Sequence, residues 1–140
     1  MKTYNLFISH SWRYEDKYEK LVKLLNEKPY FDYKNHSVPS TRPIVTATGT
    51  DEELYAAIKN KIKGTNVVII LAGVYATYSN WINNEIYIAK NEFTLPKPIL
   101  AIEYWGSERT SKIVKDKADL IVKWNTDSIV NAIKELSKKI

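Results

Sequence analysis

The chain has 140 residues and a formal net charge of +5, and its 44% apolar and 26% charged residues are ordinary for a globular protein. Ten Tyr, four Trp and three Phe are enough to fill a core, so the composition excludes a disordered or fibrous chain and predicts a single domain over residues 1–140. The absence of Cys excludes disulfides and thiolate chemistry, and with two His we expect no metal site.

Residues 4–9 form a short, mostly apolar run, which predicts a central strand. Residues 15–28 repeat apolar side chains at helical spacing. We expect Pro29 to end this helix, because proline disfavours the helical conformation of the residue before it. Residues 30–50 show no sustained period, so they predict one short edge strand and a long loop.

Thr50 and Glu53 match a capping box, in which each side chain bonds the backbone amide of the other, and this predicts the start of a helix that Gly64 can close. Residues 66–71 are a continuous apolar run rich in β-branched side chains, typical of a strand covered on both faces. The remaining patterns predict, in order, a helix over residues 79–91, a strand over 98–104, a short helix over 111–117, a strand over 120–124 and a helix over 129–140.

This alternation of strand and helix predicts an α/β fold, because right-handed crossovers build a parallel sheet with helices on both faces. At this length we expect a flavodoxin-like three-layer sandwich with five mainly parallel strands in the order 2-1-3-4-5. Ligands of such folds bind beyond the carboxyl ends of the strands, where the strand order reverses. In this order the reversal lies between the first and third strands.

The loops predicted at that point carry Ser9, Ser11, Trp12 and Tyr75. The two serines are candidates for contacts with ribose or phosphate, although serines in such a position also satisfy backbone groups of a turn. Trp12 and Tyr75 are candidate stacking surfaces for a ligand.

The next predicted helix carries Trp81 and Glu85, which are four residues apart and therefore share a helix face. That face differs from the apolar face marked by Ile82 and Ile86. We therefore expect a carboxylate beside an aromatic ring at the mouth of the crevice, with Trp81 either stacking on a ligand or packing under the helix.

Three segments, residues 5–12, 31–39 and 79–85, resemble the Toll/interleukin-1 receptor (TIR) domains, and more narrowly the short ThsB-like TIR proteins of the Thoeris anti-phage defence system. The last segment holds the W-x-x-x-E pattern of enzymatic TIR domains. The resemblance implies an NAD nucleosidase or ADP-ribosyl cyclase that cleaves the nicotinamide–ribose bond and cyclises ADP-ribose. Glu85 matches the catalytic glutamate of the family, and a fixed negative charge there would stabilise an oxocarbenium-like ribose.

The same resemblance implies that NAD is a substrate and that no cofactor is needed. Its implied partner is an effector protein reached through a diffusible cyclic nucleotide, and self-association on activation is a further expectation. Residues 1–6 do not read as a signal peptide and no apolar run is long enough to cross a bilayer, so we expect a cytoplasmic protein without membrane contact.

Other interpretations remain open at this point. The middle segment, residues 31–39, lacks the Arg-Asp…Pro-Gly loop of receptor and plant TIR domains. One alternative function is a non-catalytic TIR-like signalling module. For Glu85 itself, the alternative is a solvent-facing helix glutamate. The lysines are scattered among acids, so nucleic-acid binding is not expected. Residues 46–50 look like a flavodoxin phosphate loop but do not follow the first strand, and no acidic residue ends the third strand, which argues against FMN binding and a response regulator.

Overall fold

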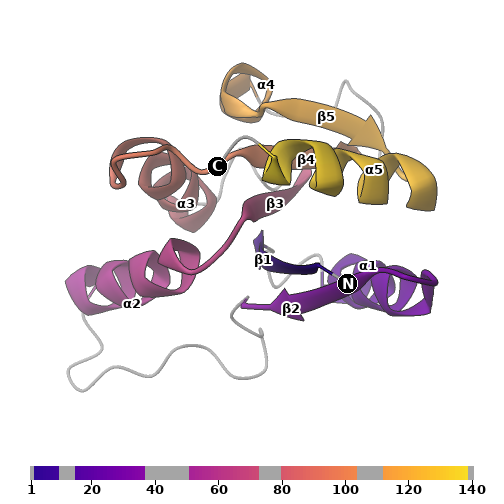
Figure 1. The fold of residues 1–140 in the computed structure, drawn as a ribbon. Coiled ribbons are helices and arrows are strands. Elements are labelled where there is room, and N and C mark those ends of the chain that lie inside the picture. Colours follow the sequence, from indigo (N-terminus) through magenta and orange to yellow (C-terminus); the bar gives the residue numbers. More distant parts are fainter. Residues whose placement is uncertain (1, 10–14, 37–50, 73–79, 104–111, 139–140) are drawn as a thin grey trace.

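The computed structural model of the chain describes residues 2–9, 15–36, 51–72, 80–103 and 112–138. Strands and helices alternate along the chain (Figure 1). The strands are β1 (Thr3–Ser9), β2 (Asp32–Asn35), β3 (Val67–Ala72), β4 (Ile99–Glu103) and β5 (Leu120–Lys123). The helices are α1 (Glu15–Glu27), α2 (Asp51–Lys63), α3 (Asn80–Asn91), α4 (Lys112–Lys117) and α5 (Thr126–Ser137).

The five strands form one parallel sheet in the order β2-β1-β3-β4-β5. This confirms the predicted flavodoxin-like α/β architecture. The strand order reverses between β1 and β3, where Ser9 pairs with Ile70. On the other side of β3, Ala72 pairs with Glu103 of β4. The carboxyl ends of the three central strands are therefore aligned at one edge of the sheet.

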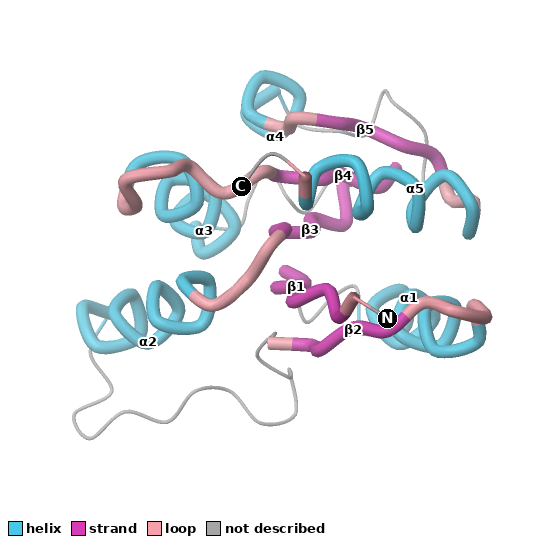
Figure 2. Tube along the Cα trace, viewed as in Figure 1, coloured by secondary structure: helices cyan, strands magenta, loops and turns pink. Residues whose placement is uncertain are grey.

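Two helical layers cover the sheet (Figure 2). On one face, Leu21 and Leu25 of α1 and Ile129 and Ile133 of α5 pack in one core cluster with the strands. On the other face, the core contains apolar side chains of α2, α3 and α4 together with Phe7 of β1. Side chains alternate between the faces of a strand, so Ser9 lies on the same face as Phe7, toward α2 and α3.

The edge strand β2 is held by an aromatic stack rather than by full burial. The rings of Tyr4 and Phe31 lie 5.4 Å apart and those of Phe31 and Tyr33 5.7 Å apart, both nearly parallel. Stacked rings of this kind add to the stability that their burial supplies. This short strand is the edge strand predicted within residues 30–50, of which residues 37–50 lie outside the described part of the chain.

The ends of the helices agree with the sequence in part. α1 ends at Glu27 as Pro29 predicts, and the following Tyr30 has a left-handed backbone with φ of 61°. α2 does end just before Gly64, but Gly64 is not left-handed. Instead Thr65 closes the helix, because its amide and its hydroxyl both donate to the carbonyl of Ile62, at 3.0 and 2.7 Å.

The N-terminal caps of α2 and α5 differ in whether the structure describes them. The predicted cap Thr50 lies outside the described residues. At α5, Asn125 caps the helix, since its side-chain oxygen accepts from the amide of Ser128 at 2.9 Å. This helix starts three residues before the apolar stripe that predicted it, and residues 139–140 lie outside the described chain.

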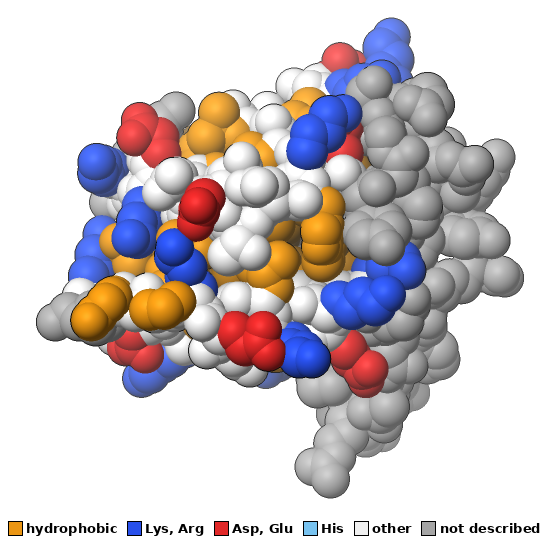
Figure 3. Space-filling view, turned by 90° about the vertical axis from the view of Figure 1, so that its right-hand side faces the viewer, with side chains coloured by type: hydrophobic (Ala, Val, Ile, Leu, Met, Phe, Trp, Pro, Cys, Tyr) orange, Lys and Arg blue, Asp and Glu red, His pale blue; other side chains and the backbone are white. Residues whose placement is uncertain are grey.

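Within the described residues, no helix has the length and apolar character needed to cross a membrane. On the face of the molecule that Figure 3 shows, basic and acidic side chains are interspersed around apolar ones.

Candidate active site

Ser9 is the last residue of β1 and lies where the strand order reverses. Its side chain is 2% exposed, because the layer formed by α2 and α3 covers this face of the sheet. Among the described residues its hydroxyl oxygen Oγ has no hydrogen-bond partner of good geometry. A buried hydroxyl without a partner costs free energy, which is typical of a polar group kept for a ligand or a reaction.

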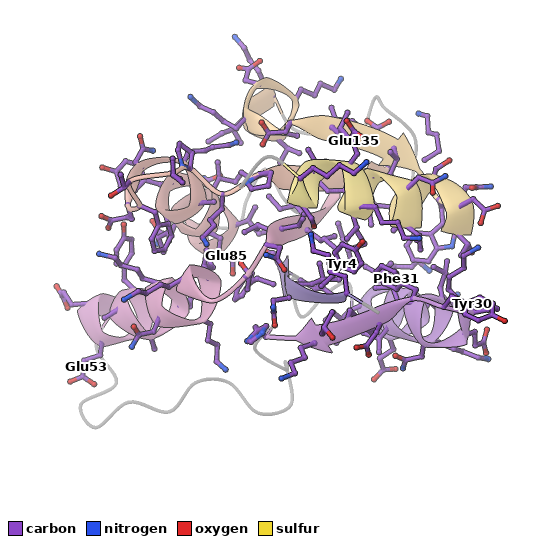
Figure 4. The ribbon with its side chains drawn as sticks, in the orientation of Figure 1. Tyr4, Tyr30, Phe31, Glu53, Glu85 and Glu135 are labelled. Atoms are coloured by element: carbon purple, nitrogen blue, oxygen red, sulfur yellow. The ribbon has the colours of Figure 1, made fainter. Side chains whose placement is uncertain are left out.

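Glu85 lies in the second turn of α3 and is 7% exposed (Figure 4). Its burial excludes the solvent-facing glutamate of the alternative interpretation. It also corrects the expected separation of two helix faces, since Glu85 is buried together with Ile82, Ile86 and Ile88. The reason is that α2 and the sheet both pack against α3, so that the buried side of this helix is broader than the stripe of isoleucines alone.

The structure brings Ser9 and Glu85 together, although they are far apart in sequence. The Ser9 hydroxyl lies beside the Glu85 carboxyl and acts to lower its pKa, as a donor to the charged form does. Glu85 Oε2 nevertheless has no hydrogen bond of good geometry to any described residue. The contact is therefore a loose one, which leaves Oε2 and Ser9 Oγ able to bond a third group.

Burial is the dominant influence on Glu85. Removal of the carboxyl from water disfavours its charged form and raises its pKa from 4.5 to about 8, against the smaller opposing effect of Ser9. At neutral pH the carboxyl is therefore mostly protonated. The negative charge expected at this position during the reaction stays a prediction.

The other predicted site residues fall outside what the structure describes. Trp81 belongs to the first turn of α3, one turn before Glu85, but its side chain is not described. Ser11, Trp12 and Tyr75 lie in the two segments 10–14 and 73–79. Their roles stay predictions.

Two further buried polar side chains lie in this part of the fold, and the sequence patterns did not predict them. Asn83 Oδ1 on α3 is buried and has no hydrogen-bond partner among the described residues. Glu103 ends β4, is 5% exposed and accepts from Lys123 Nζ at 2.8 Å. A charged residue that closes an otherwise apolar strand is a signal that could have pointed to Glu103.

The described residues offer no group of three or more His, Asp or Glu that could hold a metal ion. A surface cleft of about 410 Å³ lies along α1, lined by Lys20, Lys23 and Glu27 with Thr126 of α5. These helices pack on the face of the sheet opposite to Glu85. The cleft is therefore separate from the pair formed by Ser9 and Glu85.

Residues 7–109 match the TIR-like domain family of the Thoeris protein ThsB. The chain belongs to this Thoeris family of TIR-like domains. The matched region includes Ser9 and Glu85 and runs from β1 past the end of β4. No curated protein matches the chain significantly. The Thoeris domain thus has its buried carboxyl within the region that defines its family.

Proposed function

We propose that this Thoeris protein cleaves the nicotinamide–ribose bond of NAD and rejoins the ADP-ribose into a cyclic nucleotide. In this proposal the nucleotide diffuses through the cytoplasm and activates a partner effector in anti-phage defence. The observation that carries the proposal is Glu85, a buried carboxyl beside the end of β1 in a TIR-like domain of the Thoeris family.

The chemistry needs little from the protein. When the bond between the ribose carbon and the pyridinium nitrogen breaks, its electron pair goes to the nitrogen, and nicotinamide leaves as a neutral molecule. No general acid is therefore required. The positive charge passes to the ribose as an oxocarbenium-like centre, which a nearby carboxylate stabilises electrostatically.

Glu85 must be ionised for this role, although burial keeps it mostly protonated at rest. Ionising a group at one pH unit below its pKa costs about 1.4 kcal/mol. A cation 4 Å away attracts a carboxylate by about 4 kcal/mol at an effective dielectric constant of 20. The attraction exceeds the cost, so a bound pyridinium favours the charged form of Glu85.

Cyclisation requires that water is excluded and that a second part of the substrate is held as the nucleophile. The burial of Glu85 supports the exclusion of water. We propose that Ser9 and Ser11 contact ribose or phosphate oxygens. We further propose that Trp12, Tyr75 and Trp81 supply the stacking surfaces that hold the two rings of the dinucleotide.

The test is to express the protein without its effector in cells that receive labelled adenine, which stays in the ADP-ribose part of NAD, and to infect them with phage. Mass spectrometry then follows NAD, nicotinamide and cyclic forms of ADP-ribose. The proposal predicts that infection lowers NAD and produces a labelled cyclic product that cells without the protein lack. Infected cells with unchanged NAD and no cyclic product would favour the non-catalytic signalling module.

A further inference from the structure

Two glutamates are buried in the layer that contains α2 and α3, but their surroundings differ. Glu103 is ion-paired with Lys123 of the neighbouring strand at 2.8 Å. Glu85 has a hydroxyl beside it and no cation among the described residues. A buried carboxyl is stable either with a cation nearby or with its own proton. Glu103 satisfies the first condition and Glu85 the second.

Several charged groups on the surrounding elements have partners other than Glu85. On α2, the Tyr55 hydroxyl donates to Glu92 at 2.6 Å and Lys59 lies 3.8 Å from the same carboxylate. On α3 itself, Lys90 pairs with Asp119. On β1 and β3, the buried residues of this face are Ser9 and apolar side chains. None of these described charges acts on the Glu85 carboxyl; among the described parts of the chain, burial and the Ser9 hydroxyl are what shift its pKa.

We propose that the cationic, oxidised nicotinamide ring displaces the proton of Glu85 when it binds, so that the site recognises its substrate by charge and releases one proton for each molecule bound. This inference rests on the proposed function, because it concerns the same substrate and the same carboxyl. The step breaks the O–H bond of Glu85 and passes the proton to solvent. The carboxylate that remains neutralises the pyridinium charge, and no covalent bond to the ligand forms.

The proposal distinguishes the two redox forms of the dinucleotide. The reduced ring is neutral, so it leaves Glu85 protonated although its size and amide are the same. While the pH is below the pKa of Glu85 in the free protein, each increase of one pH unit should raise the affinity for the oxidised form about tenfold. The reason is that one proton is released on binding. Affinity for the reduced form should not follow this dependence.

The experiment is isothermal titration calorimetry of the full chain at pH 6.5 in two buffers with different ionisation enthalpies. One ligand is the carbocyclic analogue of oxidised NAD, in which a methylene group replaces the ring oxygen of the nicotinamide ribose and prevents cleavage. The other is NADH. The difference in measured enthalpy between buffers gives the number of protons released.

We expect about one proton released with the analogue and none with NADH. Glu85→Gln should abolish the release, whereas Glu135→Gln, the same substitution at an exposed glutamate of α5, should retain it (Figure 4). In parallel, the carbon-13 resonance of the Glu85 carboxyl should report a protonated group at pH 6.5 that ionises when the analogue is added. This signal keeps the proposal testable even where Glu85→Gln folds poorly.

Binding of the analogue without proton release, or no binding at all, would overturn the proposal. A Glu85 resonance that is already ionised in the free protein at pH 6.5 would also overturn it. Failure of the proposed function looks different, because the labelled cells would then make no cyclic product whatever the analogue does in the calorimeter. The two ideas can therefore fail separately.

Discussion

Glu85 has opposing effects on the stability of the domain and on its proposed chemistry. The apolar layer that excludes water from the carboxyl also makes its charged form unfavourable. In an unfolded chain the same carboxyl is in water and ionises near its ordinary pKa of 4.5. Folding at neutral pH therefore requires Glu85 to take up a proton.

This difference predicts how stability depends on pH. Below pH 4.5 the carboxyl is protonated in both the folded and the unfolded chain, so Glu85 adds no pH dependence to stability. Between the unfolded pKa of 4.5 and the folded pKa of about 8, only the folded chain keeps the proton. The contribution of Glu85 to the free energy of unfolding should therefore fall as pH rises through this window, by an amount on the order of 5 kcal/mol, and level off above it.

Urea unfolding of the wild type and of Glu85→Gln at intervals from pH 5 to 9 measures this contribution. The amide cannot ionise, so the variant should gain stability relative to the wild type as pH rises, and the difference should level off above about pH 8. Parallel curves for the two proteins would show that the folded state does not protonate Glu85.

At the scale of single elements, the two helix ends with unusual residues offer the clearest tests. Gly64 follows α2 without a left-handed backbone, and a Cβ atom placed there would meet nothing within 4 Å. Gly64→Ala should therefore stabilise the fold by about 0.4–1 kcal/mol, because alanine restricts the unfolded chain. Chemical denaturation compares the two proteins, and a loss of stability would mean that the helix end needs glycine after all.

Tyr30 is the reverse of Gly64, because it is a residue other than glycine that has a left-handed backbone. It has φ of 61° and is 87% exposed, so its backbone is strained and its ring contributes little burial. A left-handed conformation costs a residue other than glycine on the order of 1 kcal/mol. Tyr30→Gly should raise the midpoint of thermal unfolding, and an unchanged or lower midpoint would show that the ring matters more than the backbone.

The ends of α1 and α2 also show which structural features a sequence pattern can predict and which it cannot. Pro29 fixed the end of α1 because its effect is local and steric. The end of α2 depends on the Thr65 hydroxyl, which reaches back to Ile62, and glycine is the stronger local signal although it is not the one used. The burial of Glu85 was missed for a related reason. The helical period identifies Ile82 and Ile86 but cannot reveal that a second helix also covers the next side of α3.

For the whole molecule, the strand order was predictable because strong rules of connection leave few arrangements for five alternating units. The β-branched run in β3 marked the central strand, all of whose residues are buried. The site was predictable only in outline, since topology brings β1 near α3 but does not give the contact of Ser9 with Glu85 or its effect on charge.

The sheet predicts an order of local stability. Amides of β3, which is fully buried and paired on both sides, should exchange with solvent only on global unfolding. Amides of the edge strand β2, which is mostly exposed, should exchange several orders of magnitude faster. Hydrogen exchange followed by NMR tests this order, and equal protection of the two strands would contradict it.

The central claim is that Glu85 performs the chemistry as a carboxylate, and one comparison tests it most directly. Messenger output is measured by mass spectrometry in infected cells that express wild type, Glu85→Gln or the exposed control Glu135→Gln at equal soluble levels. The loss of preorganised electrostatic stabilisation typically costs a hundredfold or more in rate. We predict that Glu85→Gln makes at most about one hundredth of the wild-type product while Glu135→Gln matches the wild type. Undiminished product from a folded Glu85→Gln protein would contradict the account.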